Sequence, residues 1–398
     1  MLEDDKTDLD LFEEDYTFVE SEEDLEGISK AGIRSATITG SDWTTETILS
    51  QIDKGNIFLN PDFQRRDAWM PNRKSKFIES IILGFPIPQL VLAERMDVRG
   101  RFLILDGKQR LLSLRQFAAM DDDKIYDQLK LRNLNVRNDL NGKSLSDFKS
   151  SLELADDLAA FENHTIRTIV IRNWPNDNFL YHVFLRLNTG TVPLSPQELR
   201  QALHPGPFVK FVDLQSRESE ALRQILKKKK PDFRMRDAEL LLRYFAFSIF
   251  LPKYAGNLKQ FLDKTCETLN EEWDDKEEQV KELLQEFELS HKAIVEVFED
   301  HAYQKWTSNR YETRFNRAIF DIMHSTFRVS EIRESMLQNK RDVIRLFQDL
   351  CREGSQFRNA IEQTTKSIGA TSTRIRLWSE GVSKIIGRNI IVPKMTNT

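Results

Sequence analysis

The first half of the chain mixes two spacings of hydrophobic residues. Runs rich in β-branched and other large apolar side chains predict short strands, and they cover residues 35–39, 89–94, 101–105 and 165–171. Apolar positions four residues apart, such as Ile48 and Ile52, predict amphipathic helices, and the predicted helices cover residues 44–53, 71–83, 108–120 and 177–187. Because only a short link separates the second and third runs, we expect an antiparallel hairpin there. Residues 121–161 give no clear assignment.

The second half of the chain has a different pattern, because long amphipathic helices replace the mixture and no strand is evident. The predicted helices cover residues 237–250, 258–270, 276–298, 315–323, 329–337, 341–351 and a last segment from 374 onward. Residues 240–247 are apolar nearly all round, which is typical of a core helix. The change falls at His204-Pro205-Gly206-Pro207. The predicted fold class is therefore α+β, with an N-terminal mixed domain followed by an all-α C-terminal domain.

Charge is unevenly distributed along the 398 residues. The formal net charge is -5, but the first 26 residues hold thirteen acidic residues and only one base, Lys6. The body from residue 27 onward is therefore about +7 and is suited to a polyanionic partner. We expect residues 1–33 to be an acidic, disordered tail. The tail either keeps the protein soluble or competes with a polyanion for the basic surface.

Several classes of protein are excluded by composition. No run of about 18 apolar residues predicts a membrane span, and the acidic N-terminus does not resemble a secretory signal. The two cysteines, Cys266 and Cys351, form neither a CxxC pair nor a metal spacing with the six histidines. We therefore expect a cytoplasmic protein without a structural zinc site and with no membrane partner.

The segment Asp106-Gly107-Lys108-Gln109-Arg110 lies between a predicted strand and a predicted helix. Glycine allows a sharp turn and the close approach of a ligand. The free N–H groups at the start of a helix attract phosphate, and Lys108 and Arg110 would add positive charge. Asp106 is placed to orient a metal ion, a hydroxyl group or a basic neighbour. By itself the motif also fits a plain turn that caps a helix, with solvated lysine and arginine.

Three further clusters place arginine, glutamine or asparagine at the ends of predicted elements, where loops can form a groove. They are Phe-Gln-Arg-Arg at 63–66, Phe-Leu-Arg-Leu-Asn-Thr-Gly at 184–190 and Leu-Ser-Pro-Gln-Glu-Leu-Arg at 194–200. Each has an ordinary explanation when taken alone. Arg65 and Arg186 fit surface charge, and Ser195 with Glu198 fits a helix-capping box.

Together and in this order, the four motifs resemble the ParB/sulfiredoxin-like N-terminal domain of GmrSD-type modification-dependent restriction proteins. The resemblance covers residues 36–205. Weaker likeness to the helical region of short, stand-alone members continues at residues 234–240, 314–318 and 371–374. The expected organisation is an acidic tail (1–33), a ParB/sulfiredoxin-like nucleotide-binding domain (34–205) and a helical domain (206–398).

The resemblance implies that the domain binds a nucleoside triphosphate with Mg²⁺, hydrolyses it in some members, and works in defence against foreign or modified DNA. The implied catalytic residues are Asp106, Gln109 and Gln64. The implied nucleotide-binding residues are Arg65, Gly107, Lys108, Arg110, Arg186 and Asn188. The chain departs from many members at Lys108, where they have glutamine.

A second departure concerns the nuclease domain that GmrSD-type proteins carry. The C-terminal half has three histidines, His291, His301 and His324, and none stands in a His-x-x-Pro or ββα-metal context. We interpret them as structural or surface residues. Cleavage of DNA, if it occurs, is then expected from a nuclease or other defence partner protein, or from the N-terminal domain itself.

Three functions remain open at this stage. The first is an NTP-binding and NTP-hydrolysing sensor or regulator in DNA defence. The second is a DNA-binding endonuclease or nickase that uses the same groove. The third is a non-catalytic, nucleotide-gated adaptor whose acidic tail masks a basic face. The run Lys227-Lys228-Lys229-Lys230 fits contact with phosphates of a DNA backbone and equally fits a solvated loop.

Overall fold

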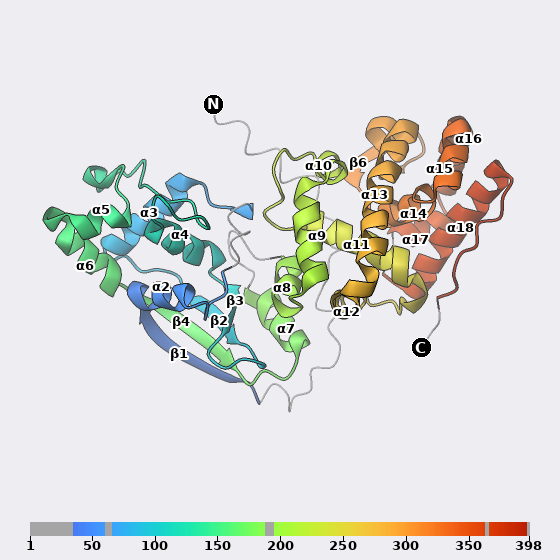
Figure 1. Cartoon of the computed structure of the whole chain (residues 1–398). Helices are drawn as coiled ribbons and strands as arrows, with labels where there is room; N and C mark the ends of the chain where they lie inside the picture. Colours follow the sequence, from blue (N-terminus) through green and yellow to red (C-terminus); the bar gives the residue numbers. More distant parts are fainter. Residues whose placement is uncertain (1–34, 60–65, 188–194, 363–365, 396–398) are drawn as a thin grey trace. The chain divides into compact units, whose positions relative to one another are not determined.

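A computed structural model describes residues 35–59, 66–187, 195–362 and 366–395. The predicted disordered tail lies outside the described residues, as do Gln64, Arg65 and Asn188. The described chain divides into two compact units. The N-terminal unit runs to Leu203 and also includes Pro231–Met235, and the helical unit comprises His204–Lys230 and the chain from Arg236 onward. The elements of each unit are labelled in Figure 1.

A four-stranded sheet forms the centre of the N-terminal unit. Its strands are β1 (Thr37–Thr44), β2 (Leu90–Glu94), β3 (Phe102–Asp106) and β4 (Thr165–Arg172), arranged in the order β1-β4-β2-β3. β2 pairs parallel with β4, while the pairs β1–β4 and β2–β3 are antiparallel. The predicted hairpin is therefore the β2–β3 pair. β2 and β3 are buried because helices cover both of their faces.

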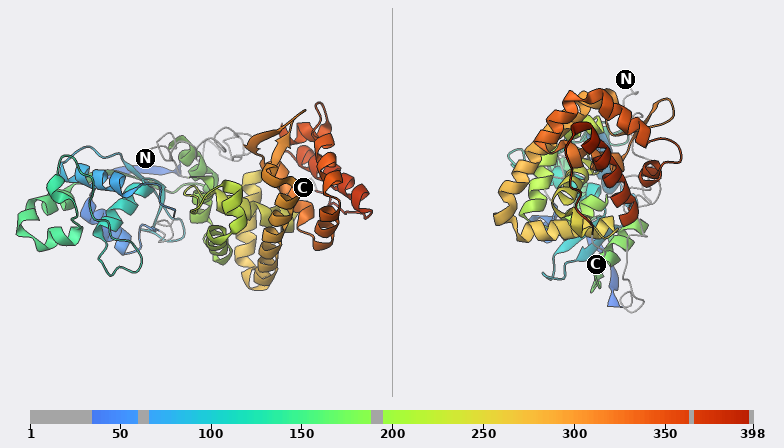
Figure 2. Two further views of the ribbon diagram at one scale, coloured as in Figure 1. Left: turned by 90° about the horizontal axis from the view of Figure 1, so that it is seen from above. Right: turned by 90° about the vertical axis from the view of Figure 1, so that its right-hand side faces the viewer.

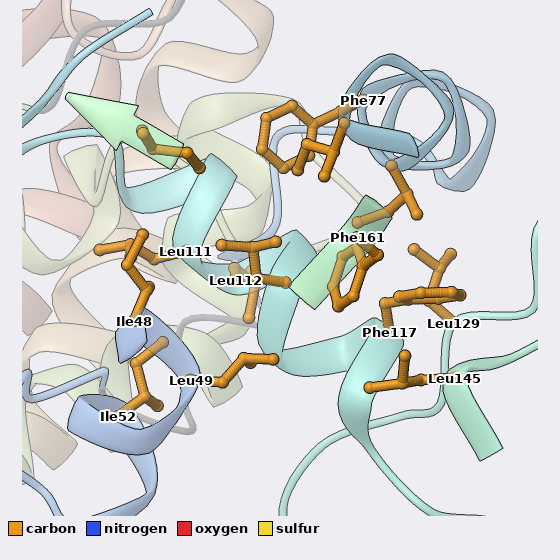
Figure 3. Packing of buried hydrophobic residues seen from close by; sticks show 14 of the residues in the cluster. Ile48, Leu49, Ile52, Phe77, Leu111, Leu112, Phe117, Leu129, Leu145 and Phe161 are labelled. Carbon is orange, nitrogen blue, oxygen red and sulfur yellow. The ribbon is translucent and has the colours of Figure 1, made fainter. Parts of the chain in front are cut away.

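Alternate residues of the central strands face two separate hydrophobic cores. Leu92 and Ile104 belong to the larger core, while Val91 and Leu105 belong to the smaller one. The period of two along a strand produces this division. The larger core is completed by α2 (Thr45–Asp53), α3 (Pro71–Ile82), α4 (Lys108–Ala118), α5 (Leu145–Ser150) and α6 (Ala155–Asn163). Its packing around α2 and α4 is shown in Figure 3.

The smaller core lies on the opposite face of the sheet. It is completed by α7 (Asp177–Leu187) and α8 (Pro196–Leu203), which both pack against β3. Since β3 ends at Asp106, the sheet brings α7 and α8 close to the start of α4. The fold thereby brings Lys108 at the start of α4 into contact with Glu198 of α8.

The helical unit is built around the long helix α13 (Trp273–Phe298), which contacts helices from both ends of the unit (Figures 1 and 2). The helices before it are α9 (Pro207–Glu218), α10 (Glu220–Leu226), α11 (Arg236–Phe250) and α12 (Leu258–Glu271). Those after it are α14 (Arg317–Phe327), α15 (Ser330–Gln338), α16 (Lys340–Leu350), α17 (Gln356–Glu362) and α18 (Ile368–Ile386). As predicted, residues 240–247 lie in a central, largely buried helix, α11.

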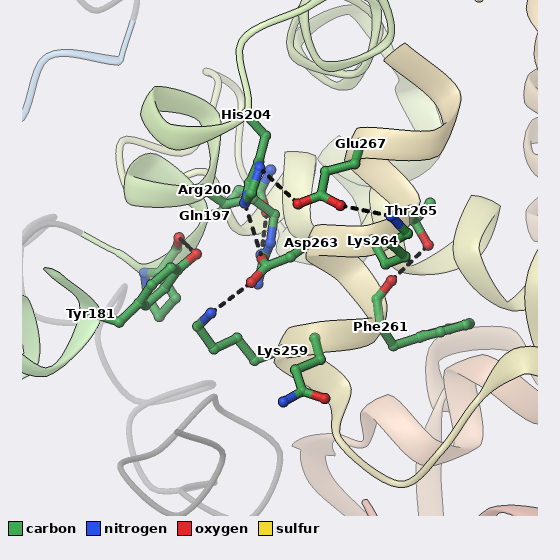
Figure 4. Close-up of polar contacts among 12 residues, drawn as sticks. Tyr181, Gln197, Arg200, His204, Lys259, Phe261, Asp263, Lys264, Thr265 and Glu267 are labelled. Carbon is green, nitrogen blue, oxygen red and sulfur yellow. Dashed lines mark hydrogen bonds and ion pairs between the residues drawn. The ribbon is translucent and has the colours of Figure 1, made fainter. Parts of the chain in front are cut away.

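Polar contacts fix the first residues of the helical unit to α12 (Figure 4). His204 lies 3.6 Å from the carboxylate of Glu267, and its carbonyl accepts a hydrogen bond from Asn270 at 3.0 Å. On the same helix, the Lys259 ammonium donates to Asp263 at 2.6 Å. These contacts place the start of the helical unit firmly on α12.

The predicted α+β class, with a helical C-terminal part, is confirmed. Two features were not predicted. The helical unit also contains a two-stranded antiparallel sheet, β5 (Gln304–Trp306) with β6 (Tyr311–Phe315), whose strands are short and only partly buried. In the N-terminal unit, the unassigned residues 121–161 form α5, most of α6 and two single 3₁₀ turns. No helix among the described residues is long and apolar enough to span a membrane.

Two of the three C-terminal histidines belong to a buried hydrogen-bond chain. The Tyr303 hydroxyl contacts Nδ1 of His291 at 2.9 Å and Nε2 of His324 at 3.1 Å, and Nδ1 of His324 contacts Ser290 at 2.7 Å. Burial lowers the pKa of His291 to about 4 and holds the pKa of His324 well below its usual value. Both imidazoles are therefore neutral at physiological pH. This agrees with a structural interpretation of these two residues.

We expect acid to destabilise the helical unit, because the unfolded chain takes up protons on these histidines below their normal pKa while the folded chain does not. Replacing His291 with glutamine should remove one such group. When the pH is lowered from about 7 to about 5, the free energy of unfolding should fall in both proteins. The fall should be smaller in the variant, by about 1–2 kcal/mol. Urea unfolding at the two pH values measures this difference, and equal losses would contradict it.

Candidate functional site

The turn between β3 and α4 is built around Gly107. Its φ of 99° lies in the left-handed region, and a Cβ atom there would lie 2.3 Å from the Leu90 side chain. Only glycine fits this position without strain. α4 then begins at Lys108, with no side-chain cap and no acidic residue in its first turn. The positive end of the helix dipole therefore meets no carboxylate from its own first turn, which favours an anionic ligand.

Arg110 folds back over this turn. Its Nη2 donates to Asp106 Oδ2 and to the carbonyl of Gln89, both at 2.9 Å. A Cβ on Gly107 would lie within 3.3 Å of the Arg110 guanidinium, so the two residues are in close contact. Asp106 also accepts a hydrogen bond from the Gly107 N–H at 2.7 Å. Asp106 thus orients a basic neighbour, which is one of the three roles that the sequence allows for it.

Lys108 is placed differently from Arg110. Its ammonium forms an ion pair with Glu198, and both side chains are about 95% buried. Glu198 also closes the predicted capping box from the third position of α8, because it accepts from the Ser195 N–H at 2.7 Å while Ser195 Oγ accepts from the Glu198 N–H at 3.2 Å. Glu198 therefore connects two of the motifs directly. The sequence predicts a phosphate contact for Lys108, and the structure shows its charge neutralised by Glu198.

Gln109 lies beside Trp69, at the start of α3. Gln109 Oε1 accepts a hydrogen bond from the Trp69 backbone N–H at 3.3 Å. The indole Nε1 of Trp69 is buried and makes no hydrogen bond within the described part of the chain. The Arg73 guanidinium stacks over the Trp69 ring at 4.5 Å. An unsatisfied indole donor beside a predicted catalytic glutamine is a feature that sequence reasoning missed.

A buried lysine lies close behind this region. The Lys74 ammonium contacts Asp67 and Gln116, and only 3% of the lysine is exposed. Burial lowers the pKa of Lys74 to about 8, although the carboxylate of Asp127 acts in the opposite direction. Lys74 belongs to the Arg73, Lys74 and Lys76 group at the start of a predicted helix. Nothing in the sequence distinguishes it as the buried member.

The arginine that follows the first motif is also buried. Arg66 is 1% exposed, and its Nη1 donates to the carbonyl of Asp232 at 2.7 Å. Asp232 lies in Pro231–Met235, the short segment that belongs to the N-terminal unit although the helical unit surrounds it in sequence. This contact satisfies one donor of the buried guanidinium. It also shows that the N-terminal unit is completed by residues beyond 205.

The remaining predicted site residues are only partly described. Arg186 is exposed in the last turn of α7, the helix that packs against β3. Gln64, Arg65 and Asn188 lie outside the described residues. The structure therefore brings together Asp106, Gly107, Lys108, Gln109 and Arg110, and adds Glu198 and Trp69 to them.

One of the comparisons with known proteins gives a match. Residues 45–205 match a family model described as "GmrSD restriction endonuclease, N-terminal domain". No curated protein and no solved structure matches the chain. The matched range begins with α2 and ends just after α8, so it contains the complete β3–α4 turn and the capping box of Glu198.

Gly107→Ala should destabilise the N-terminal unit by about 2–4 kcal/mol, because it combines backbone strain with a collision against Leu90. Gly84→Ala is the matched control. Gly84 also has a left-handed φ, of 72°, but nothing lies within 4 Å of its Cβ position, so only about 1–2 kcal/mol of strain is expected. Urea unfolding measures both changes. Equal losses for the two variants would show that contact with Leu90 does not matter.

Lys108→Met should destabilise the unit by about 3–5 kcal/mol, because it leaves the Glu198 carboxylate buried without a countercharge. The double variant Lys108→Met/Glu198→Gln removes both charges and keeps an oxygen for the Ser195 cap. It should regain most of the lost stability. A double-mutant cycle measured by urea unfolding tests the coupling, and additive losses would mean that the two side chains act independently.

Proposed function

We propose, from the premise that residues 45–205 are a GmrSD-type restriction N-terminal domain, that this chain binds and hydrolyses a nucleoside triphosphate at the β3–α4 turn. The family match supports the broader role, which is restriction-type DNA defence. The turn geometry supports the finer one. In this proposal the nucleotide state regulates action on DNA, carried out by this chain or by a partner nuclease.

The observation that carries the proposal is the left-handed Gly107 at the head of α4, with the Arg110 guanidinium folded over it. Backbone N–H groups at a helix start bind phosphate oxygens without a side-chain cap. The planar guanidinium of arginine adds N–H donors that can bind two phosphate oxygens at once. Asp106 holds this guanidinium in place at 2.9 Å, so little conformational entropy is lost when phosphate binds.

The neighbouring side chains have separate roles in this proposal. Lys108 holds the turn against α8 through Glu198, rather than donating its charge to phosphate. Gln109 orients water near the terminal phosphate, and the unsatisfied Trp69 Nε1 donates to the ligand. Gln64, Arg65, Arg186 and Asn188 are proposed to complete the site, as the family motif implies.

The residues at the turn also fit a magnesium ion that arrives with the triphosphate. Mg²⁺ is held in such sites by one or two carboxylates, by phosphates and by water. The Asp106 carboxylate is 47% exposed, and it is placed at the phosphate-binding turn. When bound, the ion would neutralise charge on the phosphates. Asp106 is the residue that would hold it.

Arg110→Ala should weaken nucleotide binding by at least about tenfold, since a hydrogen bond to a charged group contributes about 1.5–3 kcal/mol. Arg101→Ala, which removes an exposed arginine directly before β3, is the charge-matched control. Thermal shift and phosphate release are measured with the four common nucleoside triphosphates and magnesium. The wild type and the control should be stabilised and should release phosphate.

Other outcomes assign the turn to another function. Stabilisation without phosphate release would favour a nucleotide-gated adaptor. No response to any triphosphate would reject the proposal and favour direct binding of the DNA backbone in the same groove. Nicking of supercoiled DNA that depends on Asp106 would then support the nickase alternative.

A further inference from the structure

The helical unit contains a pocket of about 620 Å³ whose lining is both polar and apolar. This volume falls within the range of about 300–1,000 Å³ that is typical of small-molecule sites. Polar side chains from α10, α13 and the β5–β6 region line it, namely Gln224, Lys227, His291, Glu299, Tyr303 and Thr313. Every one of these residues belongs to the helical unit, so the pocket is separate from the β3–α4 turn.

The buried hydrogen-bond chain of the helical unit ends at the wall of this pocket. Nε2 of His291 lies 3.0 Å from Oε1 of Gln224, and because an amide oxygen only accepts, this ring nitrogen carries the hydrogen and donates it. Nδ1 of His291 then accepts from the Tyr303 hydroxyl, and the Tyr303 oxygen accepts from Nε2 of His324. His291 therefore presents a neutral N–H donor at the pocket wall.

Backbone strain is concentrated at the same wall. Lys227, Glu299 and Tyr303 have φ values of 53°, 52° and 63°, in the left-handed region that side chains other than glycine, asparagine and aspartate rarely adopt. They are three of the six non-glycine residues with positive φ in the described part of the chain. Lys227 and Glu299 are the C-caps of α10 and α13, a place where glycine is common, so each side chain is present at a cost in backbone strain. At Lys227 and Glu299, glycine would fit the backbone better.

We propose that this pocket binds a small hydroxylated phosphate ester, of which a mononucleotide is the model. The Lys227 ammonium would bind the phosphate, with the exposed Lys229 and Lys230 raising the local positive potential. Glu299 and the adjacent Asp300 would accept hydrogen bonds from hydroxyl groups. The N–H of His291 Nε2 would donate to an oxygen of the ligand in place of the Gln224 amide oxygen. A cation and two carboxylates in the lining of one pocket match an anionic ester that also carries hydroxyls.

The test uses the full chain with the Arg110→Ala substitution, so that binding at the β3–α4 turn does not contribute. Isothermal titration is performed with adenosine monophosphate and glucose phosphate, and with adenosine and glucose as unphosphorylated counterparts. At least one of the two phosphate esters should bind. It should bind at least about tenfold more tightly than the same compound without phosphate, because that compound cannot make the charge-assisted contact. Binding of neither ester would overturn the proposal.

Two glycine substitutions separate binding from folding. Lys227→Gly and Glu299→Gly should each weaken binding of the ester by about tenfold or more. Each should also raise the thermal midpoint of unfolding, because backbone strain is relieved. Asn173→Gly, at a φ of 51° in the N-terminal unit, relieves strain away from the pocket and should leave binding unchanged. Lys229→Gln is the charge control and should weaken binding much less than Lys227→Gly. Undiminished binding in both glycine variants would overturn the assignment of the pocket.

Discussion

The buried ion pair between Lys108 and Glu198 is the contact on which the arrangement of the N-terminal unit depends. It joins the first residue of α4, on one face of the sheet, to α8 on the other face. Two charges buried in this way are tolerated only because they neutralise each other and because Glu198 accepts a further hydrogen bond from the Ser195 N–H. The pair therefore fixes the distance between the β3–α4 turn and α8. Since Gly107 precedes Lys108 directly, the geometry of the turn is set by the same contact.

The sequence predicts those parts of the fold that local patterns determine. The strand, turn and helix around Asp106–Arg110 were predictable because glycine ends the strand and an amphipathic pattern follows it. The partner of Lys108 was not, because Glu198 is fully explained as a capping residue. The β5–β6 hairpin was missed because its strands are short and only partly buried, so they show no alternation. The burial of Arg66 depends on Asp232, 166 positions away, and no local pattern indicates such a contact.

The two sites are proposed to bind phosphate by different physical means. At the β3–α4 turn, backbone N–H groups and one arginine would do so, and glycine makes the close approach possible. In the helical unit, residues held in unfavourable backbone conformations line a pocket whose histidine is kept neutral by burial. The turn suits a polyphosphate, since several hydrogen-bond donors converge on one point. The pocket suits recognition of a whole small molecule, since its polar side chains come from several elements.

The way in which the chain crosses between its units limits how they can be taken apart. The backbone leaves the N-terminal unit after Leu203, returns to it for Pro231–Met235 and leaves again at Arg236. A fragment cut near residue 205 would contain the whole matched family region but would lack the carbonyl that accepts from the buried Arg66 guanidinium. Recombinant work on the N-terminal unit alone therefore calls for an insert that carries residues 231–235 on a designed loop. For the same reason, one unit cannot be replaced by that of another protein through a single end-to-end gene fusion without separating residues 231–235 from the N-terminal unit.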